Sequence, residues 1–213
     1  MGDVFQEVDE DIRKDRIKSI WKRYRIFFIL FLLFVIGAVC FNSFWTQYKL
    51  KKVEERSEKY FFAMDEATAN AQKGVDALKI FSDEENDSSY HVLLANLKEA
   101  AIRRSKNDLH NALNIYENIL ENNIEQTYKD FVQIQLSEVL MELGNLEEAK
   151  IILFDVSNTN TAFASVAKEY IGYIAMQEGD LIKARNIFEE LTKGATTPIT
   201  IKNRVKDILV TIK

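Results

Sequence analysis

The sequence predicts an all-α protein in which a single N-terminal transmembrane helix is followed by an α-solenoid of helix-turn-helix repeats. The 213 residues include only seven Gly and one Pro, and a sandwich or barrel of short strands needs many more turn residues. One long apolar block stands near the start of the chain, and one helical pattern recurs three times in its second half. These observations favour long helices throughout.

The charge distribution argues against a general nucleic-acid-binding surface. The net charge is −5, and the bases are concentrated in residues 12–25, which carry seven Lys or Arg and one acid. Because this basic stretch adjoins the apolar block, we interpret it as the flank of a membrane span rather than an RNA-binding segment. The one cysteine, Cys40, lies inside the apolar block, which excludes a disulfide framework and leaves the rest of the chain compatible with an oxidising compartment.

The apolar block predicts a transmembrane helix at residues 26–45. Residues 26–41 contain no polar side chain, and a helix of about 20 residues spans about 30 Å, the thickness of the hydrocarbon layer. A buried helix of a soluble protein would keep a polar stripe. A cleaved signal peptide would end in small residues, whereas Phe44 and Trp45 stand here. We therefore expect an uncleaved anchor.

The flanks of this span predict its orientation. Residues 13–25 carry seven Lys or Arg, whereas residues 46–58 carry four. Positive flanks favour the cytoplasmic side, so residues 1–25 are expected to be a cytoplasmic segment. Four aromatic residues bracket the span as candidate interfacial anchors: Trp21, Tyr24, Trp45 and Tyr48.

Residues 46–87 are predicted to be a helical connector that begins the repeat domain. Their apolar residues recur at helical spacing, so we expect the anchor helix to continue outward and to join the repeat core near Ala77, Leu78 and Phe81. Residues 82–89 read as an acidic polar loop, in which Ser88 or Ser89 could cap the next helix. The repeat domain proper is assigned to residues 88–213.

Three segments of the repeat domain align on Ala112, Ala149 and Ala184, which are 37 and 35 residues apart. Five residues before each alanine stands Asn or Gly, which tolerates the left-handed conformation that ends a helix. Asp or Asn follows and can cap the next helix. Asn145 also has Glu148 three residues later, the spacing of a capping box. The turn pairs are Asn107-Asp108, Gly144-Asn145 and Gly179-Asp180.

Small and bulky residues surround each of these alanines in the same register. Twelve residues earlier stands a small residue and four residues later a bulky one, which would let two antiparallel helices approach closely. The small residues are Ala100, Ser137 and Gly172, and the bulky ones are Tyr116, Leu153 and Phe188. Thr197 and Pro198 read as the N-cap and the first residue of a final helix. That helix would cap the stack through Ile199, Val205, Ile208, Leu209 and Ile212.

These segments resemble tetratricopeptide repeats, whose period is about 34 residues and whose hallmark positions include small residues, Ala and Phe. The resemblance implies a superhelix with a concave face that binds peptides or proteins. The whole layout, from the acidic residues 5–13 through one span to degenerate repeats, is similar to the YfgM-like family, most of all its α-proteobacterial members. That family is described as ancillary SecYEG translocon subunits, and its repeat domain is grouped with that of the cell-division protein CpoB.

The resemblance also implies which residues face a partner. Carrying the groove positions over to this chain gives six candidate protein-binding residues: Arg104, Glu138, Met141, Glu169, Tyr173 and Met176. Met and Tyr suit adaptable binding to apolar segments. The alternative for Met141, Tyr173 and Met176 is that they pack between the repeats.

No pattern in the sequence predicts catalysis, a cofactor or a metal. The two histidines, His91 and His110, are expected to be isolated surface residues, because no His/Cys set has metal-ligand spacing. Phosphate-binding glycine motifs and the G-x-S-x-G motif of serine hydrolases do not occur. Acidic pairs such as Glu147-Glu148 read as solvated helix faces.

The leading hypothesis is a non-catalytic, membrane-anchored interaction subunit that assists protein export at the Sec translocon and periplasmic chaperone contacts. It implies a single-pass bacterial inner-membrane protein with a periplasmic C-terminal domain. The expected partners are the membrane and proteins, namely translocon subunits, membrane-anchored chaperones or exported chains, with no nucleic acid and no small-molecule substrate. The alternative is an envelope or cell-division scaffold. A third hypothesis, a membrane-tethered enzyme, lacks a recognisable site.

Overall fold

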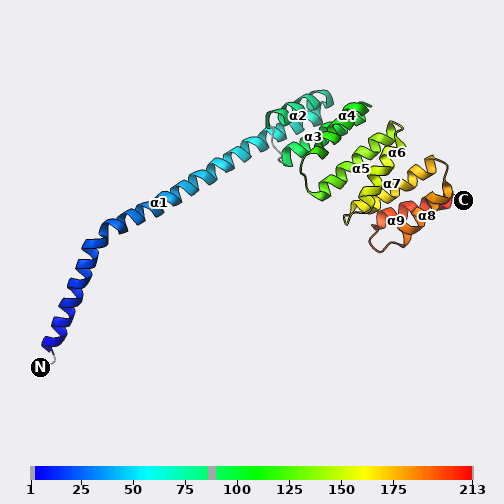
Figure 1. Ribbon diagram of the computed structural model, residues 1–213. Coiled ribbons are helices and arrows are strands. Elements are labelled where there is room, and N and C mark those ends of the chain that lie inside the picture. The colour runs from blue at the N-terminus through cyan, green and yellow to red at the C-terminus, as the bar shows by residue number, and fades with distance from the viewer. Residues whose placement is uncertain (1–2, 86–89, 213) are drawn as a thin grey trace. The chain divides into compact units, whose positions relative to one another are not determined.

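The computed structural model describes residues 3–85 and 90–212, and within these ranges the chain forms helices and no strands (Figure 1). The backbone divides into two compact units, residues 1–55 and residues 56–213. The helices are α1 (Asp3–Ala69), α2 (Ala71–Glu85), α3 (Tyr90–Ser105), α4 (Leu109–Glu121), α5 (Gln126–Glu142), α6 (Leu146–Ser157), α7 (Phe163–Gln177), α8 (Leu181–Lys193) and α9 (Ile199–Thr211).

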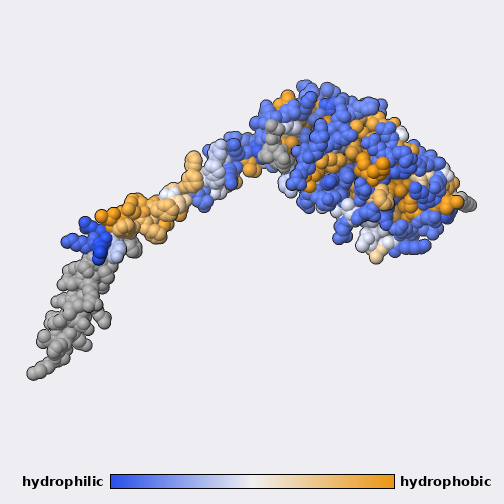
Figure 2. All heavy atoms as spheres, viewed as in Figure 1, coloured by the Kyte–Doolittle hydropathy of each residue, from blue (hydrophilic) through white to orange (hydrophobic). Residues whose placement is uncertain are grey.

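The first unit consists of the part of α1 up to Glu55, and it carries one stretch long and apolar enough to cross a membrane. Its described apolar side chains are exposed; Phe34, for example, keeps 73% of its surface accessible. Figure 2 shows this stretch as a continuous hydrophobic band. Because monomeric soluble proteins rarely expose so large an apolar surface, and because the segment has the length of a bilayer span, α1 fits the helix of a single-pass membrane protein.

Aromatic and basic side chains mark the end of this apolar stretch. Lys49 Nζ lies 5.6 Å from the centre of the Trp45 ring, and Lys52 Nζ lies 5.4 Å from the centre of the Tyr48 ring. An aromatic ring followed one turn later by a cation is the combination that suits the headgroup layer of a bilayer. This arrangement fits the predicted interfacial role of Trp45 and Tyr48.

The second unit begins with a helical hairpin that the sequence analysis did not predict. Instead of one continuous connector, α1 ends at Ala69, and Asn70 Oδ1 accepts hydrogen bonds from the amides of Gln72 and Lys73 at 2.9 and 3.2 Å. The chain turns back tightly, since a Cβ on Gly74 would lie 2.1 Å from the Cα of Ala67.

The turn makes α2 antiparallel to the end of α1, so that Arg56 contacts Glu85 at 2.6 Å and Lys59 contacts Glu84 at 3.1 Å. The predicted core residues Leu78 and Phe81 are buried between these helices and α3. Residues 82–85 belong to α2, so the predicted loop over 82–89 is wrong in its first half. The predicted caps Ser88 and Ser89 lie outside the described residues.

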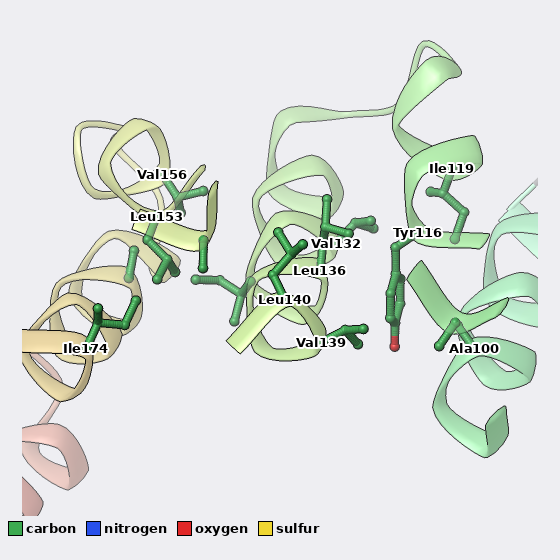
Figure 3. Close-up of a cluster of buried hydrophobic side chains, with 14 of the residues drawn as sticks. Ala100, Tyr116, Ile119, Val132, Leu136, Val139, Leu140, Leu153, Val156 and Ile174 are labelled. Atoms are coloured by element: carbon green, nitrogen blue, oxygen red, sulfur yellow. The ribbon is translucent and has the colours of Figure 1, made fainter. Parts of the chain in front are cut away.

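The three predicted repeats are present as the hairpins α3–α4, α5–α6 and α7–α8. Ala112, Ala149 and Ala184 are all completely buried, as the common register requires. Their small partners lie on the facing helix: a Cβ on Gly172 would meet the Phe188 ring at 2.4 Å. Figure 3 shows Tyr116 of α4 alongside Ala100 of α3 and Val139 of α5, so each bulky residue fills the space that a small residue leaves.

The turns inside the three hairpins have one geometry. Asn107, Gly144 and Gly179 have φ values of 62°, 83° and 81°. In each turn the amide of the next residue bonds back to a carbonyl five residues earlier, at 2.8 to 2.9 Å. These are the bonds of the Schellman motif, which explains the need for Gly or Asn.

The predicted side-chain caps are correct in one repeat only. Asp180 accepts from the amide of Lys183 at 3.0 Å. Asn145 forms no side-chain cap, so the expected capping box with Glu148 is not formed. Asp108 instead accepts hydrogen bonds from the side chains of Arg103 and Asn111, which draws its carboxylate away from the helix end.

The final helix, α9, closes the stack as predicted, but its register differs in detail. Val205 and Ile212 are buried against the third repeat, and Ile208 and Leu209 pack beside them. Ile199 is 67% exposed, and Ile201 takes the buried place instead. The helix begins at Ile199 with Pro198 as its N-cap, one residue later than the sequence suggested.

Candidate protein-interaction surface

The first helices of the three repeats and α9 are joined by polar side chains that reach from one repeat to the next. We call this set the polar ladder. Its members are Arg104, Glu138, Glu142, Glu169, Tyr170, Tyr173 and Arg204.

The upper part of the polar ladder is centred on Arg104 of α3. Its Nε and Nη2 donate to Glu142 Oε1 at 2.9 and 2.6 Å, and its Nη1 donates to Glu138 Oε2. The other oxygen of Glu138 accepts from the Tyr170 hydroxyl on α7. One carboxylate on α5 therefore joins three successive repeats.

The lower part is centred on Glu169 of α7, whose side chain is almost completely buried. Arg204 of α9 donates to both of its oxygens, and the Tyr173 hydroxyl donates to Oε1 at 2.7 Å. Two parallel N–H donors fit a carboxylate in fixed orientation. The buried charge is thus compensated, and the last helix is held to the third repeat.

The ladder shifts the pKa values of its members. Burial opposes the charge of Arg104, but its hydrogen bonds to Glu142 and Glu138 raise its pKa above the usual value. The hydrogen bonds from Arg204 to Glu169 raise the pKa of Arg204 as well. Burial, together with the hydrogen bond to Glu169, raises the pKa of Tyr173 to about 12. Burial and the contact with Glu138 raise the pKa of Tyr170. All four groups therefore keep one protonation state at neutral pH.

A cavity of about 290 Å³ opens beside the upper part of the ladder, between α3 and α5. Arg104 and Glu142 form its charged wall, and Ala101, Ser105 and Gln135 complete its lining. A partner that enters this cavity would meet both charged groups and small side chains.

The six candidate binding residues thus occupy two kinds of position. Arg104, Glu138, Glu169 and Tyr173 belong to the polar ladder. Met141 is half-buried against the core of the first two repeats, whereas Tyr173 and Met176 are half-buried against the core formed by the third repeat and α9. The structure brings four of the candidates together in two directly bonded pairs, Arg104 with Glu138 and Tyr173 with Glu169. Three further partners were not predicted from the sequence: Glu142, Tyr170 and Arg204.

The spacing of the bonded residues in the sequence is a signal from which these unpredicted partners could have been found. The bonds join residues 34, 38, 32 and 35 positions apart, close to one repeat. Residues of opposite charge at that separation, such as Arg104 with Glu138 and Glu169 with Arg204, would have indicated the ladder.

In the part of the chain that the structure describes, no group of three His, Cys, Asp or Glu side chains could hold a metal ion. His91 is not an isolated surface residue as expected, because it is half-buried, with its ring 5.4 Å from that of Tyr60 and Nε2 3.4 Å from the Ser57 hydroxyl. His110 is exposed, as expected.

Stacked helical hairpins in one register, joined by a polar ladder, define a repeat protein of the tetratricopeptide class. The chain belongs to the family described as the tetratricopeptide repeat-like domain, whose family model matches residues 18–206. That match includes the apolar stretch of α1 as well as the repeats.

One relative is similar to this chain over nearly the whole length of both proteins. The chain is 22% identical over 189 residues to a Haemophilus influenzae protein named ancillary SecYEG translocon subunit, and the match covers 89% of this chain and 91% of the relative.

Solved structures confirm the fold. Two crystal structures of TPR-like repeats from a Podosopora anserina kinesin light chain, one of them carrying a point substitution, align with TM-scores of 0.56 and 0.57. Their sequence identities are 12% and 13%, and each alignment covers 73% of this chain and 84% of the other. At such identities the likeness concerns the fold alone.

Proposed function

We propose that this chain is a non-catalytic, membrane-anchored interaction subunit that assists protein export at the Sec translocon. The observation that carries the proposal is one polypeptide with an apolar span in α1 and a stack of tetratricopeptide-like repeats after it. The similarity to an ancillary SecYEG translocon subunit over nearly the whole of both chains supports the choice of partner.

The proposal assigns a place to each segment. Residues 1–25 lie in the cytoplasm, residues 26–45 cross the bacterial inner membrane, and residues 46–87 lead into a periplasmic repeat domain that extends over 88–213. The excess of Lys and Arg before the span supports this orientation. Periplasmic chaperones and emerging chains would then share a compartment with the repeats.

The repeat surface supports binding that is individually modest. Many polar groups of the ladder are already bonded to a neighbouring repeat. A partner would therefore contact the half-buried Met141 and Met176, the edge of Tyr173 and the cavity beside Arg104. Tethering two proteins to one membrane raises their local concentration and compensates for a small contact area. The six candidate residues remain our proposal for this contact.

Photo-crosslinking in native membranes tests the proposal. A photoreactive amino acid is placed at Met141 or at Tyr173, and the captured proteins are identified by mass spectrometry. The matched control carries the same probe at Asn186, an exposed position on α8.

We expect translocon subunits or chaperones from Met141 or Tyr173 and not from Asn186. Recovery of division proteins alone would reject the export role and leave the envelope or cell-division scaffold as the function. Equal capture from all three positions would show that these helices do not form the contact surface.

A further inference from the structure

A second cavity, of about 460 Å³, lies between α2, α3 and α4, away from the polar ladder. Its volume falls within the roughly 300–1,000 Å³ that ligand sites occupy. Five asparagines line it: Asn96 on α3, Asn111, Asn114 and Asn118 on α4, and Asn122 at the C-cap of α4. The three on α4 are three and four residues apart, which places them on one face of that helix. We call this cavity the asparagine pocket.

Several polar groups in the pocket have no partner among the residues that the structure describes. The Ser82 hydroxyl is buried without a hydrogen bond, which is costly for a polar group in a folded protein. The side-chain amide of Asn96, which is half-buried, and those of Asn114 and Asn118, which are exposed to solvent, form no hydrogen bond to another described residue, although those of Asn111 and Asn122 do. The pocket therefore presents donors and acceptors that its own fold does not use.

These polar residues are a property of the first repeat and not of the fold. Glu99, which is 5% exposed, lines the pocket and accepts from Arg103 at 2.7 Å. The positions equivalent to Glu99 in the other two repeats are Leu136 and Ile171. Those equivalent to Arg103 are Leu140 and Ala175. The second and third repeats pack with apolar residues at both positions. Packing alone therefore does not explain why the first repeat has an ion pair there.

The chemistry of the lining selects an uncharged ligand with an apolar part. Lys79 and Arg103 balance Asp83 and Glu99, so the formal charge of the lining is zero. Apolar side chains complete the cavity: Val92, Leu93, Ile115, Ile119 and Ile124. No aromatic ring lies among the described lining residues on which a sugar or a base could stack.

We propose that the asparagine pocket binds an extended polypeptide segment through its main chain. Each peptide unit has one donor and one acceptor, and a carboxamide side chain offers both kinds of group, so unpartnered asparagines match successive peptide units. An apolar side chain of the segment fills the aliphatic part of the cavity. This inference rests on the proposed function and adds to it a site that recognises unfolded chains with little regard to sequence.

The test compares two peptides that differ only in their main-chain donors. One is a blocked, fluorescein-labelled peptide of eight alternating Ser and Leu residues, and the other carries N-methyl groups on alternate peptide nitrogens. Binding is measured by fluorescence anisotropy with the full chain in lipid nanodiscs. We expect the N-methylated peptide to bind about 10-fold or more weakly, because several hydrogen bonds are lost. Equal binding of the two peptides, or no binding of either, would overturn the proposal.

Variants locate the site. Asn96→Ala and Asn118→Ala should each weaken binding about 2- to 10-fold, whereas Asp155→Ala, at the position of the second repeat equivalent to Asn118, should not. Ser82→Ala separates binding from folding: it removes an unsatisfied buried hydroxyl, so the melting temperature should stay equal or rise while affinity falls. Unchanged affinity in all three pocket variants would refute the site.

The two proposals can fail separately. Crosslinks from Tyr173 to translocon subunits without any effect of the pocket variants on peptide binding would retain the proposed function and reject the pocket. Peptide binding that depends on Asn96 and Asn118, without crosslinks to the translocon, would retain the pocket and reject the partner.

Discussion

Replacing Arg204 by Gln should destabilise the repeat unit by leaving the buried carboxylate of Glu169 without its main partner. Glu169 is 1% exposed and receives two hydrogen bonds from Arg204 and one from Tyr173. Breaking a fully buried ion pair costs about 3–5 kcal/mol. Because the Arg204 side chain is 54% exposed, water reaches the vacated side of the carboxylate, and we expect a smaller loss of about 2–3 kcal/mol.

This loss corresponds to a decrease in melting temperature of roughly 4–12 °C for a unit of this size. The assay is thermal unfolding of the full chain in detergent, followed by circular dichroism at 222 nm. The double variant Glu169→Gln, Arg204→Gln removes the buried charge together with its partner, so it should be more stable than Arg204→Gln alone. Lys206→Gln, an exposed change on the same helix, is the control and should stay within about 0.5 kcal/mol of the parent.

Two results would refute the reasoning. The first is an Arg204→Gln variant as stable as Lys206→Gln. The second is a double variant whose loss equals the sum of the single losses, because additivity would show that Glu169 and Arg204 contribute independently.

Three further predictions follow from the geometry. Gly179→Ala should cost about 1–2 kcal/mol because its φ of 81° disfavours a Cβ, whereas Asn107→Gly, at the equivalent turn, should be neutral or stabilising in the same denaturation assay. Gly74→Ala should cost about 1–3 kcal/mol, since its Cβ would overlap backbone atoms of α1; an unchanged midpoint would contradict the tight turn. Tyr173→Phe should remove one tyrosine that titrates near pH 12 in an absorbance titration; loss of one that titrates near pH 10 would contradict its contact with Glu169.

The raised pKa of Tyr173 also determines the direction in which the stability of the fold changes with pH. Folding raises the pKa of Tyr173 from about 10 to about 12. Its contribution is therefore fully present below pH 10 and is lost as the pH rises through 12.

The repeats could be predicted from the sequence because their cause is local and occurs three times. A positive φ at Asn107, Gly144 and Gly179 and a buried small residue at Ala112, Ala149 and Ala184 each restrict the residue types that fit. Requirements on the residue type at particular positions can be recognised in a single sequence. The apolar span could also be recognised because its requirement for apolar residues is local.

The first hairpin could not be predicted in the same way. A single Asn70 side chain caps α2, and Gly74 matters only because Ala67 lies against it. Either residue alone is ordinary within a helical pattern, and the close approach is known only once both helices are placed.

The candidate surface was predicted in part. The groove positions included Arg104, Glu138, Glu169 and Tyr173, but their mutual bonds depend on how the helices stack, as does the place of Arg204. The asparagine pocket escaped the sequence analysis because asparagines on a helix face read as ordinary solvated residues until a cavity is seen between α2, α3 and α4.

Purification of the full chain from native membranes in a mild detergent tests the membrane-anchored interaction role most directly. The proteins that co-elute with it on size exclusion are identified and quantified by mass spectrometry. We predict that the chain stays in the membrane fraction until detergent is added and then co-elutes with translocon subunits. A chain released without detergent, or one that elutes free of any translocon subunit, would contradict this role.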